Sequence, residues 1–376
     1  MLIDMEPKVV QACMETGERS GTWQYASESC YCRQEGSGNN WAFGYKGHGE
    51  SAREELVDLC RVRVEATDRL SGVQIFHSLG GGTGSGVGAQ LTESLRDALG
   101  SCVPLLNTVV WPHEFGEVIL QNYNSVLTLS HVCTSADGVL VFYNDQLAQL
   151  ARSELGIERP EFSHMNGLIT SVLASIFVPV HPPGLLATYS QYGTSTYEAV
   201  LADLCSMPSY NFLSTYSVPL LSHKSLEFSA DIWPQLLTRV QKMALSNAAG
   251  TKINWGLTAE KGNRMLGATC ILRGLTVQDA DTSQLSDPKL YTNWAGPKYQ
   301  EFRSDALLER YERRATLVSN SQSIAGPLDQ LIEKTHQMAQ SRAYMHHFEK
   351  FGLRDSDFTE FAFPVLEQVV YNYKHL

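Results

Sequence analysis

The sequence predicts an α/β protein built on a doubly wound, mainly parallel sheet. Three short apolar runs have the length of buried strands, at residues 73–79, 103–110 and 138–143. Between the first two runs, apolar residues recur at helical spacing, at Val87, Leu91, Leu95 and Ala98. Strands that alternate with helices form parallel sheets, whose ligands bind at the carboxyl edge of the strands.

The rest of the chain predicts two further domains. A long helix is expected near 163–178, strands near 213–219 and 267–273, a polar, turn-rich segment over 278–300, and helices from about 322. We therefore expect a nucleotide-binding domain at 1–143, a central helix with an α+β domain at 144–320, and a C-terminal helical pair at 321–376. Leu2 and Ile3 have the character of a strand end, so the first domain is expected to be truncated at its N-terminus.

Composition excludes several classes of function. The 376 residues include 40 acidic and 29 basic ones, a net charge of −11, and no basic face that nucleic-acid binding would require. The eight cysteines are scattered without a C-x-x-C pair, and the histidines show no H-E-x-x-H spacing, so we expect reduced thiols and no structural or catalytic metal. No apolar run reaches the roughly 18 residues of a membrane span, so no membrane association is expected.

The glycine-rich loop at residues 80–86, "GGGTGSG", carries the strongest functional signal. It follows a predicted strand and precedes a predicted helix, so its backbone N–H groups and the helix N-terminus can hold phosphate. Val87 stands where a P-loop needs lysine, and a G-x-S-x-G elbow does not fit. A relaxed dinucleotide fingerprint, Gly84-x-Gly86-x-x-Ala89, leaves an NAD-linked dehydrogenase as one alternative, and a turn without ligand is another.

Together with its flanking strand and helix, this loop resembles the signature of the tubulin family. The resemblance continues through "IDMEP", "GSGNNWAFGY", "NYNSVLTLSH", "SELGIERPEF", "VSNS" and "RAYMHHFEKFG", in the family's order. Within the family, "WPHEFGEVILQNYNSVLTLSH", "ILRGLTVQDAD" and "VSNSQSIAGPLD" are most similar to the delta branch. The resemblance implies a tubulin-like fold that lacks the first strand, the first helix and the "GQCGNQ" loop, so residues 1–376 are expected to bind GTP weakly or not at all.

The resemblance also assigns a nucleotide site, residue by residue. Phosphate and Mg²⁺ contacts are expected from Asp4, Glu6, Asn39, Gly81, Gly82, Thr83, Gly84 and Ser85. Ribose contacts are expected from Glu117 and Gln121, where the family usually has Glu at the second position. Base contacts are expected from Asn144 and Asn166, with Phe162 stacking on guanine where alpha and beta chains have Tyr.

For function, the resemblance implies a cytoskeletal protein that binds GTP or GDP, possibly with Mg²⁺. Its delta character implies a cytoplasmic location at the centrosome, centrioles, basal bodies and cilia, with other tubulins or centriolar proteins as partners and a role in triplet microtubules. A gamma-like template or lattice-forming tubulin is the alternative within the family. The family's hydrolytic acid aligns with Ala199, beside Glu198 and short of Asp203, so no catalytic residue is assigned and any GTPase activity is expected to be weak and to need a partner subunit.

Overall fold

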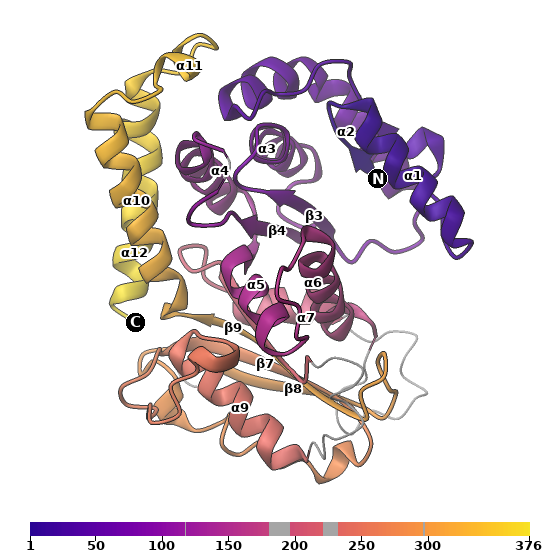
Figure 1. Ribbon diagram of the computed structural model, residues 1–376, viewed down its shortest axis with the longest axis vertical. Helices are drawn as coiled ribbons and strands as arrows, with labels where there is room; N and C mark the ends of the chain where they lie inside the picture. Colours follow the sequence, from indigo (N-terminus) through magenta and orange to yellow (C-terminus); the bar gives the residue numbers. More distant parts are fainter. Residues whose placement is uncertain (117, 180–195, 221–231, 296–297) are drawn as a thin grey trace. The chain divides into compact units, whose positions relative to one another are not determined.

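A computed structural model describes residues 1–376 apart from 117, 180–195, 221–231 and 296–297 (Figure 1). The chain forms two compact units, residues 1–136 with 329–368, and residues 137–328 with 369–376. The three-domain division drawn from the sequence is finer than this and stays a prediction. Among the described residues, no helix combines the length and the apolar character that crossing a bilayer requires.

The first unit contains two pairs of parallel strands and the helices that pack on them. Its N-terminal part comprises β1 (Leu2–Ile3), α1 (Pro7–Ser20), β2 (Cys30–Tyr31), α2 (Glu50–Glu65), β3 (Val73–Ser78), α3 (Gly88–Leu99), β4 (Leu105–Trp111) and α4 (Gln121–Ser135). Strand β1 pairs with β2, and β3 pairs with β4 from Val73↔Leu105 to Ser78↔Val110. Leu2 and Ile3 therefore lie in a strand, as predicted, and α1 follows it from Pro7.

The core of the first unit lies where α2 and α3 meet the start of the chain. Its buried apolar residues are Met5, Ala52, Leu56, Cys60, Val87, Leu91 and Leu95. Val87, Leu91 and Leu95 come from one stripe of the helix that follows the glycine loop, so the predicted helical spacing is confirmed. Burial of this stripe fixes the direction in which the N-terminus of α3 points.

Residues 329–368 belong to the same unit. They contain most of α10 (Ala325–Gln340), α11 (His346–Glu349) and the beginning of α12 (Phe363–Lys374). The ring of Tyr123 on α4 packs edge-on against Phe348 and Phe358, and its hydroxyl donates to the carbonyl of Ala343 at 3.0 Å. This part of the C-terminal segment is thus anchored on α4.

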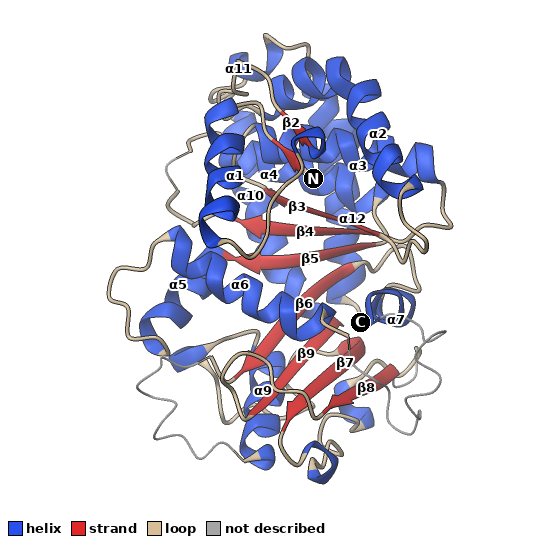
Figure 2. Ribbon diagram, turned by 90° about the vertical axis from the view of Figure 1, so that its right-hand side faces the viewer, coloured by secondary structure: helices blue, strands red, loops and turns tan. Residues whose placement is uncertain are grey.

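The second unit is a mixed sheet with helices on both faces (Figure 2). Its elements are β5 (Gly138–Tyr143), α5 (Asn144–Ser153), α6 (Phe162–Phe177), α7 (Thr196–Leu204), β6 (Phe212–Val218), α9 (Trp233–Ser246), β7 (Met265–Gly274), β8 (Lys298–Ser304) and β9 (Arg313–Ser321). The strands follow the order β5-β6-β9-β7-β8. β5 and β6 are parallel, as are β7 and β8, whereas β9 runs antiparallel to both β6 and β7.

The expected elements are present, and the strands β8 and β9 were not predicted. Strands at 73–78, 105–111, 138–143, 212–218 and 265–274 and a helix at 162–177 match the predicted ranges to within a few residues. The prediction of a turn-rich segment over 278–300 was wrong at its end, because β8 begins at Lys298. With the sequence "KYQEFRS", β8 is polar because it is an edge strand, and only Phe302 is buried.

Candidate functional site

The glycine loop joins β3 to α3. β3 ends at Ser78, and a helical turn over Thr83–Val87 continues directly into α3. The N–H of Gly86 donates to the carbonyl of Gly82 at 2.8 Å, so the helical hydrogen bonds begin here. The N–H groups of the residues just before Gly86 have no acceptor within the helix and lie at its positive end. The structure therefore confirms the strand–loop–helix context on which the phosphate hypothesis depends.

The glycines of this loop do not share one role. A Cβ on Gly82 would lie 2.6 Å from the backbone nitrogen of Asn40, and one on Gly86 would collide with the carbonyl of Trp41. At Gly84 the Cβ would lie 3.0 Å from the nitrogen of Ser78. At Gly81, by contrast, it would meet only Asn39 Oδ1, at 3.9 Å. Gly82, Gly84 and Gly86 are thus needed for backbone packing, while Gly81 borders open space that ligand atoms can enter.

The two hydroxyl residues of the loop are also arranged differently from each other. Thr83 Oγ1 lies 3.0 Å from Ser37 Oγ, which joins the loop to the segment around Asn39. Ser85 is fully buried, and its hydroxyl donates to the carbonyl of Gly81. The Ser85 hydroxyl is thus bonded within the loop. The phosphate hypothesis therefore depends on the backbone N–H of Ser85 and not on its side chain.

Asn124 on α4 holds these segments together, and the sequence did not reveal it as a site residue. Its Nδ2 donates to the carbonyls of Asn39 and Gly80, both at 2.8 Å, and its Oδ1 accepts from the N–H of Trp41 at 3.0 Å. The side chain is fully buried. A polar amide inside the buried helical stretch "NYNSVLTLS" was the available signal, because a buried amide needs partners.

The acidic turn at the start of the chain borders the same segment. Asp4 Oδ1 accepts from the N–H of Glu6 at 2.9 Å, and the N–H of Asp4 donates to Tyr31 at 3.1 Å. A Cβ on Gly36 would lie 2.6 Å from Glu6 Oε1, so the Glu6 carboxylate rests against the residue next to Ser37. Glu6 and Thr83 are therefore connected through two consecutive residues, and hard oxygen ligands of the kind that Mg²⁺ prefers lie beside the loop region.

Of the two predicted ribose contacts, only one can be described. Glu117 lies outside the described residues. Gln121, the first residue of α4, is buried, and its Nε2 donates to the carbonyl of His113 at 2.8 Å. Its Cβ lies 3.7 Å from where a Cβ on Gly80 would be, so Gln121 is next to the glycine loop, with its amide nitrogen bonded within the protein.

The three predicted base contacts belong to the second unit. Asn144 is the first residue of α5, directly after β5, and is 9% exposed. Phe162 is the first residue of α6 and is 63% exposed. A capping box between Glu161 and His164 fixes this helix start. Asn166 lies one turn later and is also exposed, so ring and amide share a face of α6.

Comparison with known proteins identifies the family. Residues 1–152 match a family model described as "Tubulin/FtsZ family, GTPase domain". The tubulin delta chain of Canis lupus familiaris is 38% identical in an alignment that covers 100% of this chain and 86% of that protein. The tubulin delta chain of Homo sapiens is 36% identical with the same coverage, and the tubulin beta-2 chain of Emericella nidulans is 24% identical over 96% of this chain and 77% of that one.

The chain belongs to the tubulin family. Within that family it resembles the delta chains, which match it at 36–38% identity. The match to the GTPase domain implies guanine-nucleotide binding.

Helix α7 (Thr196–Leu204) carries the residue that aligns with the family's hydrolytic acid. Ala199 stands there and is 8% exposed, so it belongs to the core of the second unit. Glu198 and Asp203, the nearest acids, are half-buried. This geometry brings no carboxylate to the aligned position, and the catalytic residue of this tubulin stays unassigned.

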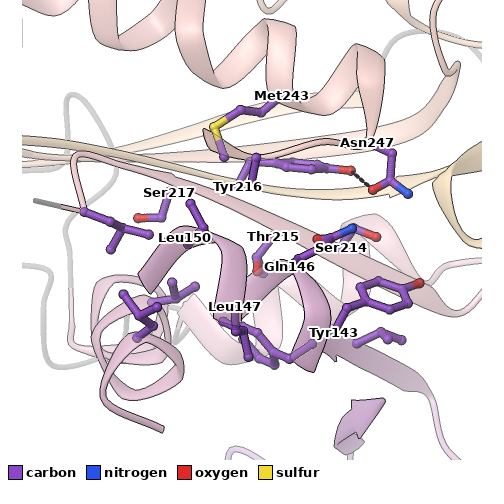
Figure 3. Close-up of a pocket in the computed structure, with 16 residues that line it drawn as sticks. Tyr143, Gln146, Leu147, Leu150, Ser214, Thr215, Tyr216, Ser217, Met243 and Asn247 are labelled. Atoms are coloured by element: carbon purple, nitrogen blue, oxygen red, sulfur yellow. Dashed lines mark hydrogen bonds between the residues drawn. The ribbon is translucent and has the colours of Figure 1, made fainter. Parts of the chain in front are cut away.

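A cavity inside the second unit is too small for a nucleotide. It lies between β5, β6, α5 and α9 and has a volume of about 40 Å³ (Figure 3). Leu147, Leu150 and Met243 contribute to its wall, and Tyr216 donates its hydroxyl to Asn247 Oδ1 at 3.1 Å. This volume suits one or two water molecules.

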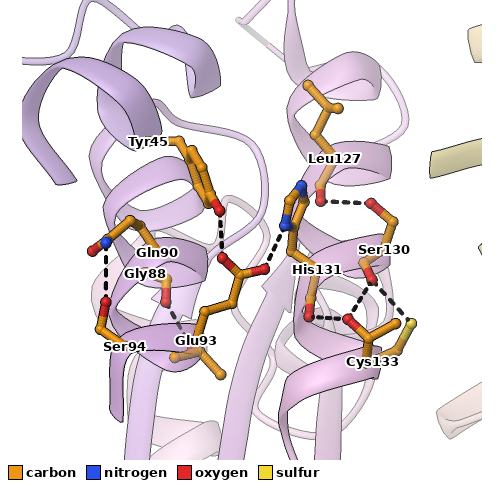
Figure 4. A network of polar contacts seen from close by, with 11 residues as sticks. Tyr45, Gly88, Gln90, Glu93, Ser94, Leu127, Ser130, His131 and Cys133 are labelled. Atoms are coloured by element: carbon orange, nitrogen blue, oxygen red, sulfur yellow. Dashed lines mark hydrogen bonds and ion pairs between the residues drawn. The ribbon is translucent and has the colours of Figure 1, made fainter. Parts of the chain in front are cut away.

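A polar cluster on α3 stabilises the helix that follows the glycine loop (Figure 4). The Glu93 carboxylate accepts from the Tyr45 hydroxyl and lies 2.6 Å from Nδ1 of His131 on α4. Burial, together with the adjacent Glu93, raises the pKa of Tyr45, so this hydroxyl stays protonated and donates. Tyr45 also stacks on Trp41 with ring centroids 4.4 Å apart. The cluster therefore joins α3 and α4 to the segment that packs on the loop.

His77 lies beneath the loop and is held neutral. Asn107 Nδ2 is 3.1 Å from His77 Nε2, and because an amide nitrogen only donates, this ring nitrogen accepts. A Cβ on Gly88, the first residue of α3, would lie 3.0 Å from the ring. Burial lowers the pKa of His77 to about 4 from an ordinary 6.5. Protonation would place an unpaired charge between β3, β4 and α3.

We predict that this histidine makes the first unit sensitive to acid. Because its pKa is lower in the folded than in the unfolded chain, the stability it contributes is complete above pH 6.5 and is lost as the pH falls toward 4. Between pH 7 and pH 5 the free energy of unfolding of the wild type should fall by about 1–2 kcal/mol more than that of His77→Gln. Urea denaturation at both pH values measures the difference; equal losses in the two proteins would show that His77 is not the sensor.

Proposed function

We propose that this chain is a delta-like tubulin that binds GTP and GDP at the glycine loop and acts in the cytoskeleton together with other tubulins. The observation that carries the proposal is Gly81, which borders open space beside Asn39 at the N-terminal end of a helix. This is where backbone N–H groups can meet phosphate oxygens without a lysine. Family membership identifies the nucleotide as a guanine nucleotide.

For the metal, the acidic turn is the best-suited part of the chain. Asp4 and Glu6 supply carboxylates beside the segment that contacts the loop. Mg²⁺ usually keeps several waters and binds one or two carboxylates together with nucleotide phosphates. We therefore assign these two residues to the ion, directly or through water. Thr83 adds a hydroxyl, and Ser85 and Gly84 add backbone donors.

The base contacts follow from the chemistry of the side chains on α5 and α6. The amides of Asn144 and Asn166 can each donate and accept, and guanine presents O6 as an acceptor and N1–H and N2–H₂ as donors. The exposed Phe162 ring offers a flat apolar face for stacking. Gln121 and Glu117 are assigned to the ribose.

The proposed cellular role rests on the delta relatives. We propose a location at the centrosome, centrioles and basal bodies of cilia, with other tubulins or centriolar proteins as partners, and a contribution to triplet microtubules. A gamma-like template role is the alternative. No carboxylate occupies the aligned catalytic position, so hydrolysis by this chain alone should be slow, and a partner subunit should accelerate it.

The proposed base contacts predict selectivity for guanine. Adenine would leave amide groups unpaired, at a cost of about 1–3 kcal/mol, so the chain should prefer GTP over ATP by about ten- to a hundredfold. Displacement of a fluorescent GTP analogue measures both affinities, and the ratio stays informative even where binding is weak. Asn144→Ala should reduce the ratio, while Phe162→Ala should weaken both nucleotides. Equal affinity of the unmutated chain for GTP and ATP would contradict these roles.

The proposed phosphate contact predicts a different result for each of two neighbouring glycines. Gly81→Ala adds a methyl group on the open side of the loop, so stability should be kept while affinity for GTP falls by about tenfold or more. Gly82→Ala forces the Cβ against the backbone nitrogen of Asn40 and should lower the free energy of unfolding by about 1–3 kcal/mol, as at other overpacked sites. Calorimetry with GTP and urea denaturation give the two quantities.

The matched control for Gly81→Ala is Gly326→Ala, which adds a methyl group where no atom of the described residues lies within 4 Å, compared with a single atom at 3.9 Å for Gly81. It should leave GTP affinity unchanged. If Gly81→Ala and Gly326→Ala bind GTP as tightly as the unmutated chain, the phosphate does not lie at Gly81.

A further inference from the structure

Two arginines are buried side by side in the second unit. Arg273 on β7 and Arg314 on β9 are register partners on antiparallel strands, and they are 2% and 1% exposed. Burial and the charge of Arg314 lower the pKa of Arg273 to about 10, and burial also lowers the pKa of Arg314. A guanidinium stays charged at neutral pH even so, and buried charges need partners.

Arg273 is satisfied by the C-terminal end of α6. Its Nε donates to the carbonyl of Ser175 at 3.0 Å, and its Nη2 donates to the carbonyl of Val178. These carbonyls lie in the last turn of the helix and at its C-cap, where a positive charge is favourable.

Arg314 has less support. Its Nε donates to Ser217 Oγ at 3.2 Å, its Nη1 donates to Glu309 Oε2 at 3.2 Å, and its Cζ lies 5.3 Å from the centroid of the Tyr311 ring. Its Nη2 is buried and has no hydrogen-bond partner among the residues that the structure describes. A buried unpaired donor on a charged group is costly. The guanidinium therefore has capacity for a further anionic oxygen.

The only carboxylate that an ion pair links to this guanidinium among the described residues is Glu309, at the tip of the turn between β8 and β9. Its Oε2 also accepts from Ser171 Oγ on α6 at 2.9 Å, yet its side chain is 41% exposed. Glu309 has a φ of 58°, in the left-handed region that favours glycine. Glutamate rarely adopts this conformation, so the contacts of its carboxylate with Arg314 and Ser171 offset the backbone strain.

Hydroxyl groups complete the surroundings. Thr316 Oγ1 lies 2.7 Å from both Ser175 Oγ and Ser217 Oγ, and Ser217 in turn accepts from Arg314. Arg314 on β9 and Ser171 on α6 thus donate to one half-exposed carboxylate, while Ser217 on β6 supports the arginine from its other side. Such a set of donors suits a carboxylate group of either internal or external origin.

We propose that Arg314 and Ser171 form a carboxylate-binding site whose resident occupant is Glu309, and that a small external carboxylate can take its place. An external carboxylate would enter from the solvent-exposed side of Glu309. Displacement of the turn at residues 308–311 would expose the Arg314 guanidinium, which is otherwise buried. The ligand class is a carboxylate: an acidic side chain presented by a partner, or a free carboxylate ion.

The test removes the resident carboxylate while relieving its backbone. Glu309→Gly removes the backbone strain at φ 58° together with the carboxylate. If relief of strain were the larger effect, the protein would become more stable. If the carboxylate is the occupant of the site, this variant should instead melt about 4–10 °C lower, because it leaves Arg314 buried without its anion. Glu312→Gln is the matched control, since that side chain is 75% exposed and its replacement should shift melting by about 1 °C or less.

Acetate then replaces the missing group. Melting is measured in sodium acetate and in sodium chloride at equal ionic strength, and the gain in acetate should be larger for Glu309→Gly than for the wild type. Ser171→Ala in the Glu309→Gly background should reduce this extra gain, because acetate loses a donor. The proposal is overturned if Glu309→Gly is as stable as the wild type, if acetate stabilises both equally, or if removal of Ser171 leaves the gain unchanged.

Discussion

The first unit depends on the close approach of two backbones. The segment from Ser37 to Tyr45 lies against the loop and helical turn at Gly82–Gly86, so closely that a single Cβ would collide at Gly44, Gly82 or Gly86. Asn124 fixes this contact with three hydrogen bonds from within the protein interior. Neither segment can move without the other, and so the glycine loop, Asn39 and Glu6 keep a common geometry.

The same contact extends to residues 329–368 of the first unit. Asn40 Nδ2 donates to the carbonyl of His347 at 2.8 Å, and the Phe43 ring stacks on Phe351 with centroids 4.6 Å apart. Lys46 donates to the carbonyl of Gly352 at 2.9 Å. The residues that border the loop on one side therefore contact α11 and its neighbours on the other, so the glycine loop is physically connected to this helix.

Much of the fold was predictable because apolar runs and helical spacing are local signals. β7, with all ten residues buried, and the stripe on α3 are clear in the sequence, whereas the polar edge strand β8 is not. Motif resemblance indicated the glycine loop and Phe162 as candidate site residues, and these roles stay predictions. It did not find Asn124, whose role arises from partners 44 to 85 positions away, or the inward turn of Ser85. Long-range hydrogen bonds leave no periodic signal in the sequence.

Amide hydrogen exchange with and without GDP tests the central claim most directly, because it reads the backbone N–H groups themselves. The account predicts slower exchange in the peptide that spans Gly80–Val87 and in the one that spans Gly36–Trp41 when GDP is added, and no change in the edge strand β8. Unchanged exchange at Gly80–Val87 under conditions in which GDP is bound would contradict it, since the phosphate would then lie elsewhere.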